Sequence, residues 1–239
     1  MKKILAIILL FLFYNVAAKE KRVVYQASVY WDIDSLESVL PKQTGIEKVN
    51  TLNGLVVSVG FEDFKKSYEY FQQSSLLAEK LNYHFGIAEA KRYLAYAYYY
   101  QSDYSQSLNL LWEARDIYES LNDKFHLAVM DQVIATLYLS AKDFDKALYY
   151  CKEAIKGYRA RDNYGQLFAS VKDTLIMYSI TGRVYRELGR SDTALSIYLN
   201  YLEIGKENNI EITNLMVHTG LVAACYIETK QYIKALEYY

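Results

Sequence analysis

The residue types that most often carry catalysis or bind metals are sparse and scattered in this chain. It has three histidines, His84, His126 and His218, and two cysteines, Cys151 and Cys225. A catalytic centre needs an acid, a base or a nucleophile converging on one place, and these residues show no such grouping. No HExxH, GxSxG, GxGxxG or phosphate-loop motif occurs, and no Cys/His spacing fits zinc. The sequence therefore predicts no enzymatic activity, no cofactor and no metal within these residues.

The elements that carry these residues follow a repeated amphipathic pattern. Apolar residues in segment 143–158 recur at the i, i+3, i+4, i+7 spacing of a helix, and related segments lie at 63–77, 103–118, 192–202 and 231–239. The small residues that open the apolar faces are Ser67, Ser107, Ala147, Ala194 and Ala235. Their spacing of about forty residues predicts an all-α fold, an α-α superhelix (solenoid) of about five helix pairs. On stacked repeats, Cys151 and Cys225 are expected to be packed thiols about two repeats apart, too distant for a disulfide.

Each segment is expected to be the second helix of a pair. The first helices are expected at 45–60, 86–101, 126–141, 165–188 and 211–229. The turns within pairs end in Asp or Ser, which cap the second helix, as at Asp63, Asp103, Asp143 and Asp192. Asparagines between the pairs, Asn82, Asn122, Asn163 and Asn209, are expected to end helices in the left-handed conformation. Residues 19–44 form a lead-in whose short helix is capped by Asp34-Ser35 and stopped by Pro41.

The first eighteen residues have the composition of a signal peptide. Lys2 and Lys3 precede the apolar run Ile4–Phe13, and Val16-Ala17-Ala18 places small residues where signal peptidase requires them. An apolar run of about ten residues is too short to span a bilayer. The mature chain is therefore expected outside the cytoplasm, in the periplasm or the extracellular medium. A net charge of −1 without a basic stripe argues against nucleic acid as a partner.

Residues 45–239 resemble the tetratricopeptide repeat, whose signature is W-x2-L-G-x2-Y on the first helix and A-x3-F with a later Ala on the second. The second unit carries Leu94, Ala95, Tyr98, Ser107, Leu111 and Ala114, and the third carries Ile134, Ala135, Tyr138, Ala147, Cys151 and Ala154. The fourth carries Gly182, Tyr185, Ala194, Tyr198 and Tyr201, and the fifth carries Val222, Ala223, Tyr226, Ala235 and Tyr239. Among the 26 tyrosines, those in the first-helix packing position, Tyr98, Tyr138, Tyr185 and Tyr226, are expected in the core.

The resemblance also implies a ligand groove. In the family, first-helix positions two, five, nine, twelve and thirteen line the concave face. Carried over, these positions give the candidate ligand-binding residues Arg92, Tyr96, Tyr99, Tyr100, Gln132, Thr136, Arg183 and Arg186. Aromatic rings with hydroxyls, together with arginines, suit a peptide or protein partner because they combine large contact area with hydrogen bonding.

Three functions remain open. The leading one is an exported repeat scaffold that binds a peptide or protein in its groove, as a sensory or protein-interaction module. The second is the extracytoplasmic sensor part of a longer histidine kinase or transcription-regulating signal transducer, similar to exported repeat sensors of Bacteroidetes-type signalling proteins. In that case, the catalytic part and any membrane span lie downstream. The third is a purely structural assembly subunit.

The last unit, which ends at Tyr239, raises a separate expectation. It lacks the later part of its second helix, and solenoids close such apolar ends with a polar cap. We expect either that natural sequence follows Tyr239 or that this end docks on a second copy, which would make a dimer.

Overall fold

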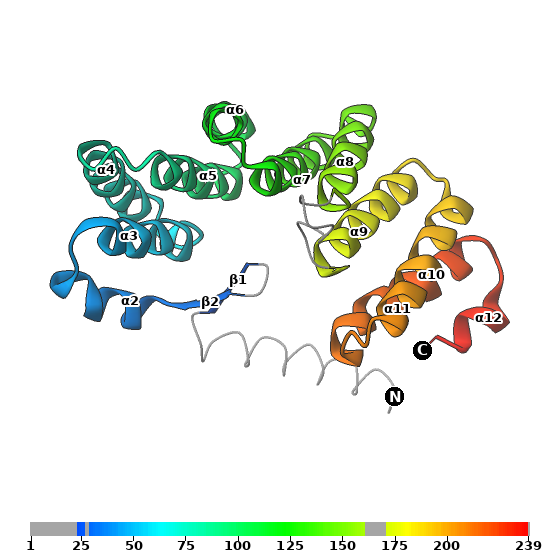
Figure 1. The fold of residues 1–239 in the computed structure, drawn as a ribbon. Helices are drawn as coiled ribbons and strands as arrows, with labels where there is room; N and C mark the ends of the chain where they lie inside the picture. The colour runs from blue at the N-terminus through cyan, green and yellow to red at the C-terminus, as the bar shows by residue number, and fades with distance from the viewer. Residues whose placement is uncertain (1–22, 27–28, 161–170, 239) are drawn as a thin grey trace. The chain divides into compact units, whose positions relative to one another are not determined.

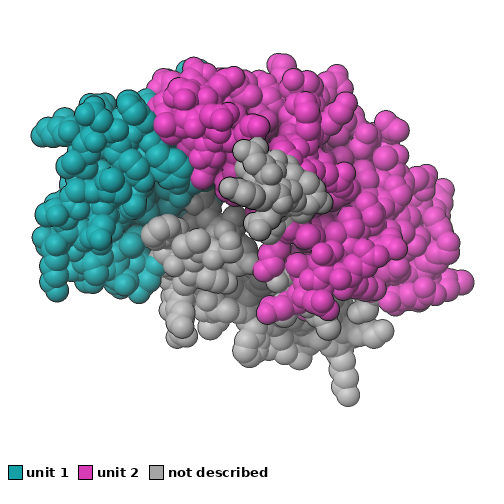
Figure 2. Space-filling view, viewed as in Figure 1, with its two compact units in different colours: residues 1–110 teal, residues 111–239 magenta. Residues whose placement is uncertain are grey.

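The computed structural model describes residues 23–26, 29–160 and 171–238 (Figure 1). The chain divides into two compact units, residues 1–110 and 111–239, and each is considered by itself (Figure 2). The predicted signal peptide at 1–18 and the predicted stop at Asn163 lie outside the described residues.

Unit 1 begins with a hairpin and a short helix ahead of its helix pairs. Strands β1 (Val23–Gln26) and β2 (Val29–Asp32) pair antiparallel, with Tyr25 opposite Tyr30. Helix α2 (Ile33–Val39) and the 3-10 turn η1 (Leu40–Lys42) follow. The sequence did not reveal the hairpin. The predicted cap at Asp34-Ser35 is wrong, because α2 already begins at Ile33 and its N-cap, Asp32, makes no side-chain hydrogen bond.

The repeating helices fall into the predicted five pairs, so the all-α solenoid fold is confirmed. Unit 1 holds α3 (Gly45–Val59), α4 (Phe64–Lys80) and α5 (His84–Tyr100), while α6 (Tyr104–Ser120) contains the boundary between the units. Unit 2 continues with α7 (Lys124–Ser140), α8 (Phe144–Tyr158), α9 (Val171–Glu187), α10 (Ser191–Glu207), α11 (Ile212–Glu228) and α12 (Tyr232–Leu236). In α3/α4, α7/α8, α9/α10 and α11/α12 the two helices of a pair pack on one another, and α4, α8 and α10 also pack on the next first helix (Figure 1).

The turn chemistry agrees with the sequence in the first three pairs and differs in the last two. Asp63, Asp103 and Asp143 accept hydrogen bonds from the backbone amides of Lys66, Gln106 and Lys146 at 3.0, 3.0 and 3.3 Å. At α10 the predicted cap Asp192 lies inside the first turn, and the N-cap Arg190 makes no side-chain bond. Gln231 likewise does not cap α12. Asn82, Asn122 and Asn209 have φ of 51°, 55° and 53°, which confirms them as left-handed helix stops.

The small residues lie where helices cross closely, as the periodicity predicted. All five, Ser67, Ser107, Ala147, Ala194 and Ala235, are buried. Ser67 and Ser107 also donate hydrogen bonds of 2.7 Å to the carbonyl oxygens of Val56 and Ala95 on the facing first helices. A larger side chain at such a crossing would force the two backbones apart.

The cores contain other tyrosines than those predicted. Tyr226 is buried, but Tyr98, Tyr138 and Tyr185 are only half-buried. The largest fully buried side chains are instead Tyr118, Tyr158 and Tyr198, all on second helices. The second helix is covered by the first helices of two pairs, which explains why its large residues are enclosed. Cys151 and Cys225 are buried free thiols, as predicted.

Candidate interaction surfaces on the first helices

In unit 1, helix α5 places an arginine among tyrosines. Arg92 Nε and Nη2 donate to the two carboxylate oxygens of Glu89 at 2.8 and 2.6 Å, and both side chains are only about one-eighth exposed (12% and 13%). The guanidinium carbon of Arg92 lies 4.2 Å from the ring centroid of Tyr93. Glu89 and Arg92 lie one helical turn apart, so the helix itself brings them together. The predicted ligand-binding arginine of α5 is therefore already neutralised by a bidentate partner.

Burial and charge fix the protonation states of this cluster. Burial alone would lower the pKa of Arg92, but the adjacent Glu89 carboxylate, together with Tyr93 and Tyr96, holds that pKa above its usual range. Burial raises the pKa of Tyr93 and Tyr96, and the nearby guanidinium only partly offsets the rise. The arginine therefore stays charged and the two phenols stay protonated at neutral pH, when a phenol can both donate and accept a hydrogen bond.

The last turn of α5 carries the remaining predicted residues of unit 1. Tyr99 and Tyr100 meet edge to face with ring centroids 5.6 Å apart, and Tyr100 meets Phe61 in the same way at 5.1 Å. Phe61 and Tyr100 are 62% and 41% exposed. Phe61 comes from the α3–α4 turn, so these rings form an accessible aromatic surface that the sequence pattern only half revealed.

In unit 2, the predicted residues of α7 are engaged within the fold. The Oε1 atom of Gln132 accepts a 2.7 Å hydrogen bond from the hydroxyl of Tyr158 on α8. The Thr136 hydroxyl donates to the backbone carbonyl of Gln132 at 3.1 Å. Both side chains are half-buried. The bond between Tyr158 and Gln132 helps to hold α7 against α8, whereas the bond of Thr136 stays within α7.

The predicted arginines of α9 differ from one another in their surroundings. Arg186 Nη2 donates to Glu228 Oε1 on α11 at 2.6 Å, and the Ser191 hydroxyl donates to Glu228 Oε2 at 2.6 Å. The hydrogen bond from Arg186 lowers the pKa of Glu228 and raises that of Arg186. Arg183 is exposed and forms no ion pair with any other described residue. Arg183 is thus the predicted arginine that the described residues leave without an ionic partner.

A further exposed surface lies on the first helix of the fifth pair, which contains none of the predicted ligand-binding residues. The same register gives Val217, Gly220, Ala224, Ile227 and Glu228 on α11. Val217 and Ile227 are 68% and 43% exposed, and Met216 beside them is 63% exposed. The sequence could have revealed these positions, because Val222, Ala223 and Tyr226 fix the repeat register of α11.

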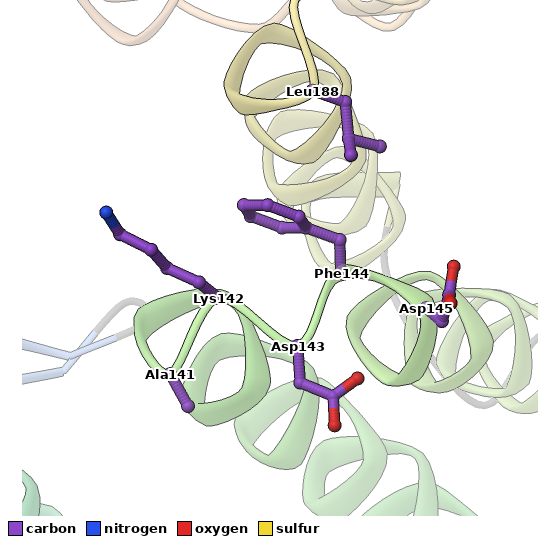
Figure 3. A pocket seen from close by; sticks show the side chains of 6 residues that line it. All are labelled: Ala141, Lys142, Asp143, Phe144, Asp145 and Leu188. Carbon is purple, nitrogen blue, oxygen red and sulfur yellow. The ribbon is translucent and has the colours of Figure 1, made fainter.

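An open depression of about 460 Å³ lies at the ends of α7 and α9. It is lined by Ala141, Lys142, Asp143, Phe144, Asp145 and Leu188. Phe144 and Leu188 point toward one another, whereas Lys142 and Asp143 point away (Figure 3). Asp143 is occupied as the cap of α8 and in an ion pair with Lys146 at 2.9 Å. The Asp143 carboxylate at this depression is therefore already engaged by Lys146.

In the part of the chain that the structure describes, no group of three or more His, Cys, Asp or Glu side chains is placed to hold a metal ion. None of the described helices is long and apolar enough to cross a membrane.

The fold and the first-helix registers define a solenoid of tetratricopeptide-type helix pairs. Residues 87–128, which run from α5 into α7, match the family model for the tetratricopeptide repeat. The recognition of this repeat from the sequence is thereby confirmed, whereas a histidine-kinase context is not. No curated protein sequence matches the chain significantly.

Similar solved structures have the same fold at low sequence identity. BtubC (BKLC) from P. vanneervenii has a TM-score of 0.68 and 15% identity, with 86% of this chain and 83% of that chain covered. A signal transduction ATPase with a tetratricopeptide repeat sensor from Pyrococcus horikoshii has a TM-score of 0.67 and 18% identity, with 87% and 31% covered. NprR in complex with its cognate peptide NprX has a TM-score of 0.61 and 18% identity, with 87% and 58% covered. The chain thus spans about a third of the ATPase and somewhat over half of NprR.

Proposed function

We propose that this protein is a non-catalytic, exported scaffold that binds a peptide or protein segment on the faces of its first helices. The observation that carries the proposal is the surface of α5, where Arg92 lies over the ring of Tyr93 and Tyr93 lies beside Tyr96. At the end of the same helix the accessible rings of Tyr100 and Phe61 meet edge to face. Rigid aromatic rings with hydroxyls bind peptides well because they offer large contact area at low entropic cost. The structural neighbour NprR is seen with a cognate peptide, which supports the same mode for this chain.

Peptide selection tests the binding part of the proposal. The purified chain is immobilised and exposed to a displayed library of random peptides of about seven residues, and enriched peptides are synthesised for affinity measurement. Replacing Tyr96 and Tyr100 by Ala should weaken binding about tenfold or more, because hot-spot aromatics dominate such interfaces. The matched control is Tyr149→Ala, which removes an exposed tyrosine (58%) from the second helix α8. The absence of any enriched peptide would refute the scaffold proposal.

Export is proposed from the first eighteen residues, and a fusion tests it. Residues 1–30 are joined to an alkaline phosphatase that becomes active only where its disulfides form. Phosphatase activity is expected, and it should disappear when charged residues interrupt the run Ile4–Phe13. An inactive fusion would exclude the periplasmic or extracellular location.

The alternative function is the sensor part of a longer histidine kinase or transcription-regulating signal transducer. It is favoured by the structural neighbour that carries a tetratricopeptide repeat sensor. The codons that follow Tyr239 discriminate between the two functions. A membrane span followed by a catalytic or DNA-binding domain would establish the signal transducer, and a stop codon within a turn or two would leave a free scaffold.

A further inference from the structure

Helix α11 exposes a continuous apolar stripe. Met216, Val217 and Ile227 are 63%, 68% and 43% exposed, and Gly220 and Ala224 lie between them on the same helical face. A Cβ added at Gly220 would meet nothing within 4 Å, so this part of the face is open. Single exposed apolar residues are ordinary, but a stripe of three large ones along one helix is typical of a contact surface.

The opposite face of α11 accounts for the stability of the helix without this stripe. Leu215, Val222, Cys225 and Tyr226 lie in the apolar core that α11 forms with α10 and α12. The helix is therefore anchored by a complete buried face, and its exposed residues are not needed to hold it in place. A contact surface on a firmly anchored helix can bind a partner without large rearrangement.

The ion pair between α9 and α11 indicates where the exposed Arg183 lies relative to the stripe. Arg186 on α9 is bonded to Glu228 on α11, so the two helices are adjacent at this level. Each helix is the first of its pair and packs on α10, so the two run in the same direction (Figure 1). One turn earlier on both helices, Arg183 therefore lies level with Ala224. The charges of Arg186 and Glu228 balance, and Glu187, one turn beyond Arg183, forms no ion pair with it.

We propose that this face of α9 and α11 selects the ligand, and that the ligand segment carries a carboxylate beside bulky aliphatic side chains. The inference rests on the proposed peptide-binding function and specifies its chemistry. The carboxylate pairs with Arg183, and the aliphatic side chains cover Met216, Val217 and Ile227. From Met216 to Ile227 the stripe is about 16 Å long, which matches about five residues of an extended peptide. The carboxylate belongs either to Asp or Glu or to the C-terminus of the ligand.

The displayed peptide library described above also tests this inference. Peptides enriched on the wild-type chain should carry Asp or Glu, or a free C-terminus, next to Leu, Ile, Val or Met. The best peptide is then measured by fluorescence anisotropy beside two modified versions. One has its acidic side chains changed to amides, and the other has an amidated C-terminus. The version that loses about tenfold in affinity identifies the source of the carboxylate.

Variants of the protein locate the site. Arg183→Glu and Val217→Asp should each weaken the best peptide about tenfold or more. Lys152→Glu makes the same charge change at an exposed position of α8, and Val39→Asp makes the same apolar-to-acidic change at an exposed position of α2. Both controls should retain wild-type affinity. Circular dichroism should give the same helix content for all four variants, because each substituted side chain is exposed.

The outcomes separate this inference from the function on which it rests. The inference is wrong if enriched peptides bind Arg183→Glu and Val217→Asp with wild-type affinity but bind the Tyr96→Ala, Tyr100→Ala double variant more weakly. That result would still support the scaffold function. Enriched peptides without acidic or aliphatic preference also overturn it. If Val217→Asp leaves the peptide affinity unchanged but lowers the particle mass measured by light scattering, the stripe is a contact between two copies instead. No enriched peptide at all refutes both.

Discussion

Acid should destabilise unit 2 through His218, a buried histidine of α11. Its side chain is 8% exposed, and it stacks on the ring of Tyr201 at a centroid distance of 3.5 Å and an angle of 13°. Both ring nitrogens are enclosed without a hydrogen-bond partner. Burial lowers the pKa of His218 from 6.5 to about 4, because a charged imidazolium would lose its hydration there.

The sign and size of the effect follow from proton linkage. The unfolded chain takes up a proton near pH 6.5 and the folded chain only near pH 4. The stability contribution of neutral His218 is therefore complete above pH 6.5 and is lost as the pH falls toward 4. At pH 5 the loss amounts to about 2 kcal/mol, and it approaches about 3 kcal/mol below pH 4.

The assay compares wild type with His218→Phe by urea unfolding at pH 7 and pH 5, followed by circular dichroism. Phe keeps the stacked ring and removes two unpaired nitrogens, so the variant should be at least as stable at pH 7. Between pH 7 and pH 5, the wild type should lose about 2 kcal/mol relative to the variant. Wild type is compared with the variant because Asp131 also titrates in this range. Burial raises the pKa of Asp131 to about 6, so its protonation stabilises the fold as the pH falls.

A matched control and a clear negative result complete the test. His84→Phe changes an exposed histidine at the start of α5 and should leave the pH dependence of the wild type intact. If the stability difference between wild type and His218→Phe is the same at both pH values, His218 is not held neutral by burial. The reasoning from its enclosed nitrogens would then be wrong.

Three packing predictions can be checked by thermal melting. Ala147→Leu should destabilise by about 1–3 kcal/mol, because Ala147 is fully buried at a helix crossing; an unchanged midpoint would contradict the repeat register. Gly182→Ala should lower the midpoint, because the new Cβ would collide with the ring of the fully buried Tyr198. Gly220→Ala should raise the midpoint and add about 0.5–1 kcal/mol to the free energy of unfolding, because the added Cβ meets nothing within 4 Å and Ala favours the helix. A lower midpoint would mean that this face of α11 is not open.

The sequence predicted the helix pairs because their signal is local and repeated. The spacing of Ala147, Cys151 and Ala154 on one helix defines its buried face, and the same spacing recurs in each pair. The caps Asp63, Asp103 and Asp143 were equally predictable, because a cap depends on residues only three positions apart. The lead-in hairpin was missed because its pairing produces no helical periodicity.

The candidate site was predicted less well because its contacts join distant positions. Glu228 lies 42 residues from Arg186, and no pattern within either helix indicates that they meet. Tyr158 and Gln132 are 26 residues apart and are brought together only by the packing of α8 on α7. The sequence could say which residues share a helical face. It could not say which of them would already be satisfied by another helix.

That difference decides which predicted arginine can select a ligand. Arg92 is held by Glu89 in a bidentate pair, and Arg186 is held by Glu228, so a ligand carboxylate would have to displace an existing partner at either position. Arg183 requires no such displacement, and the exposed residues Met216, Val217 and Ile227 lie on the helix beside it. On α5, by contrast, protonated phenols and exposed rings offer contact area without a net attraction for charge. Charge selectivity is therefore expected from α9 and α11, where Arg183 is the exposed cation.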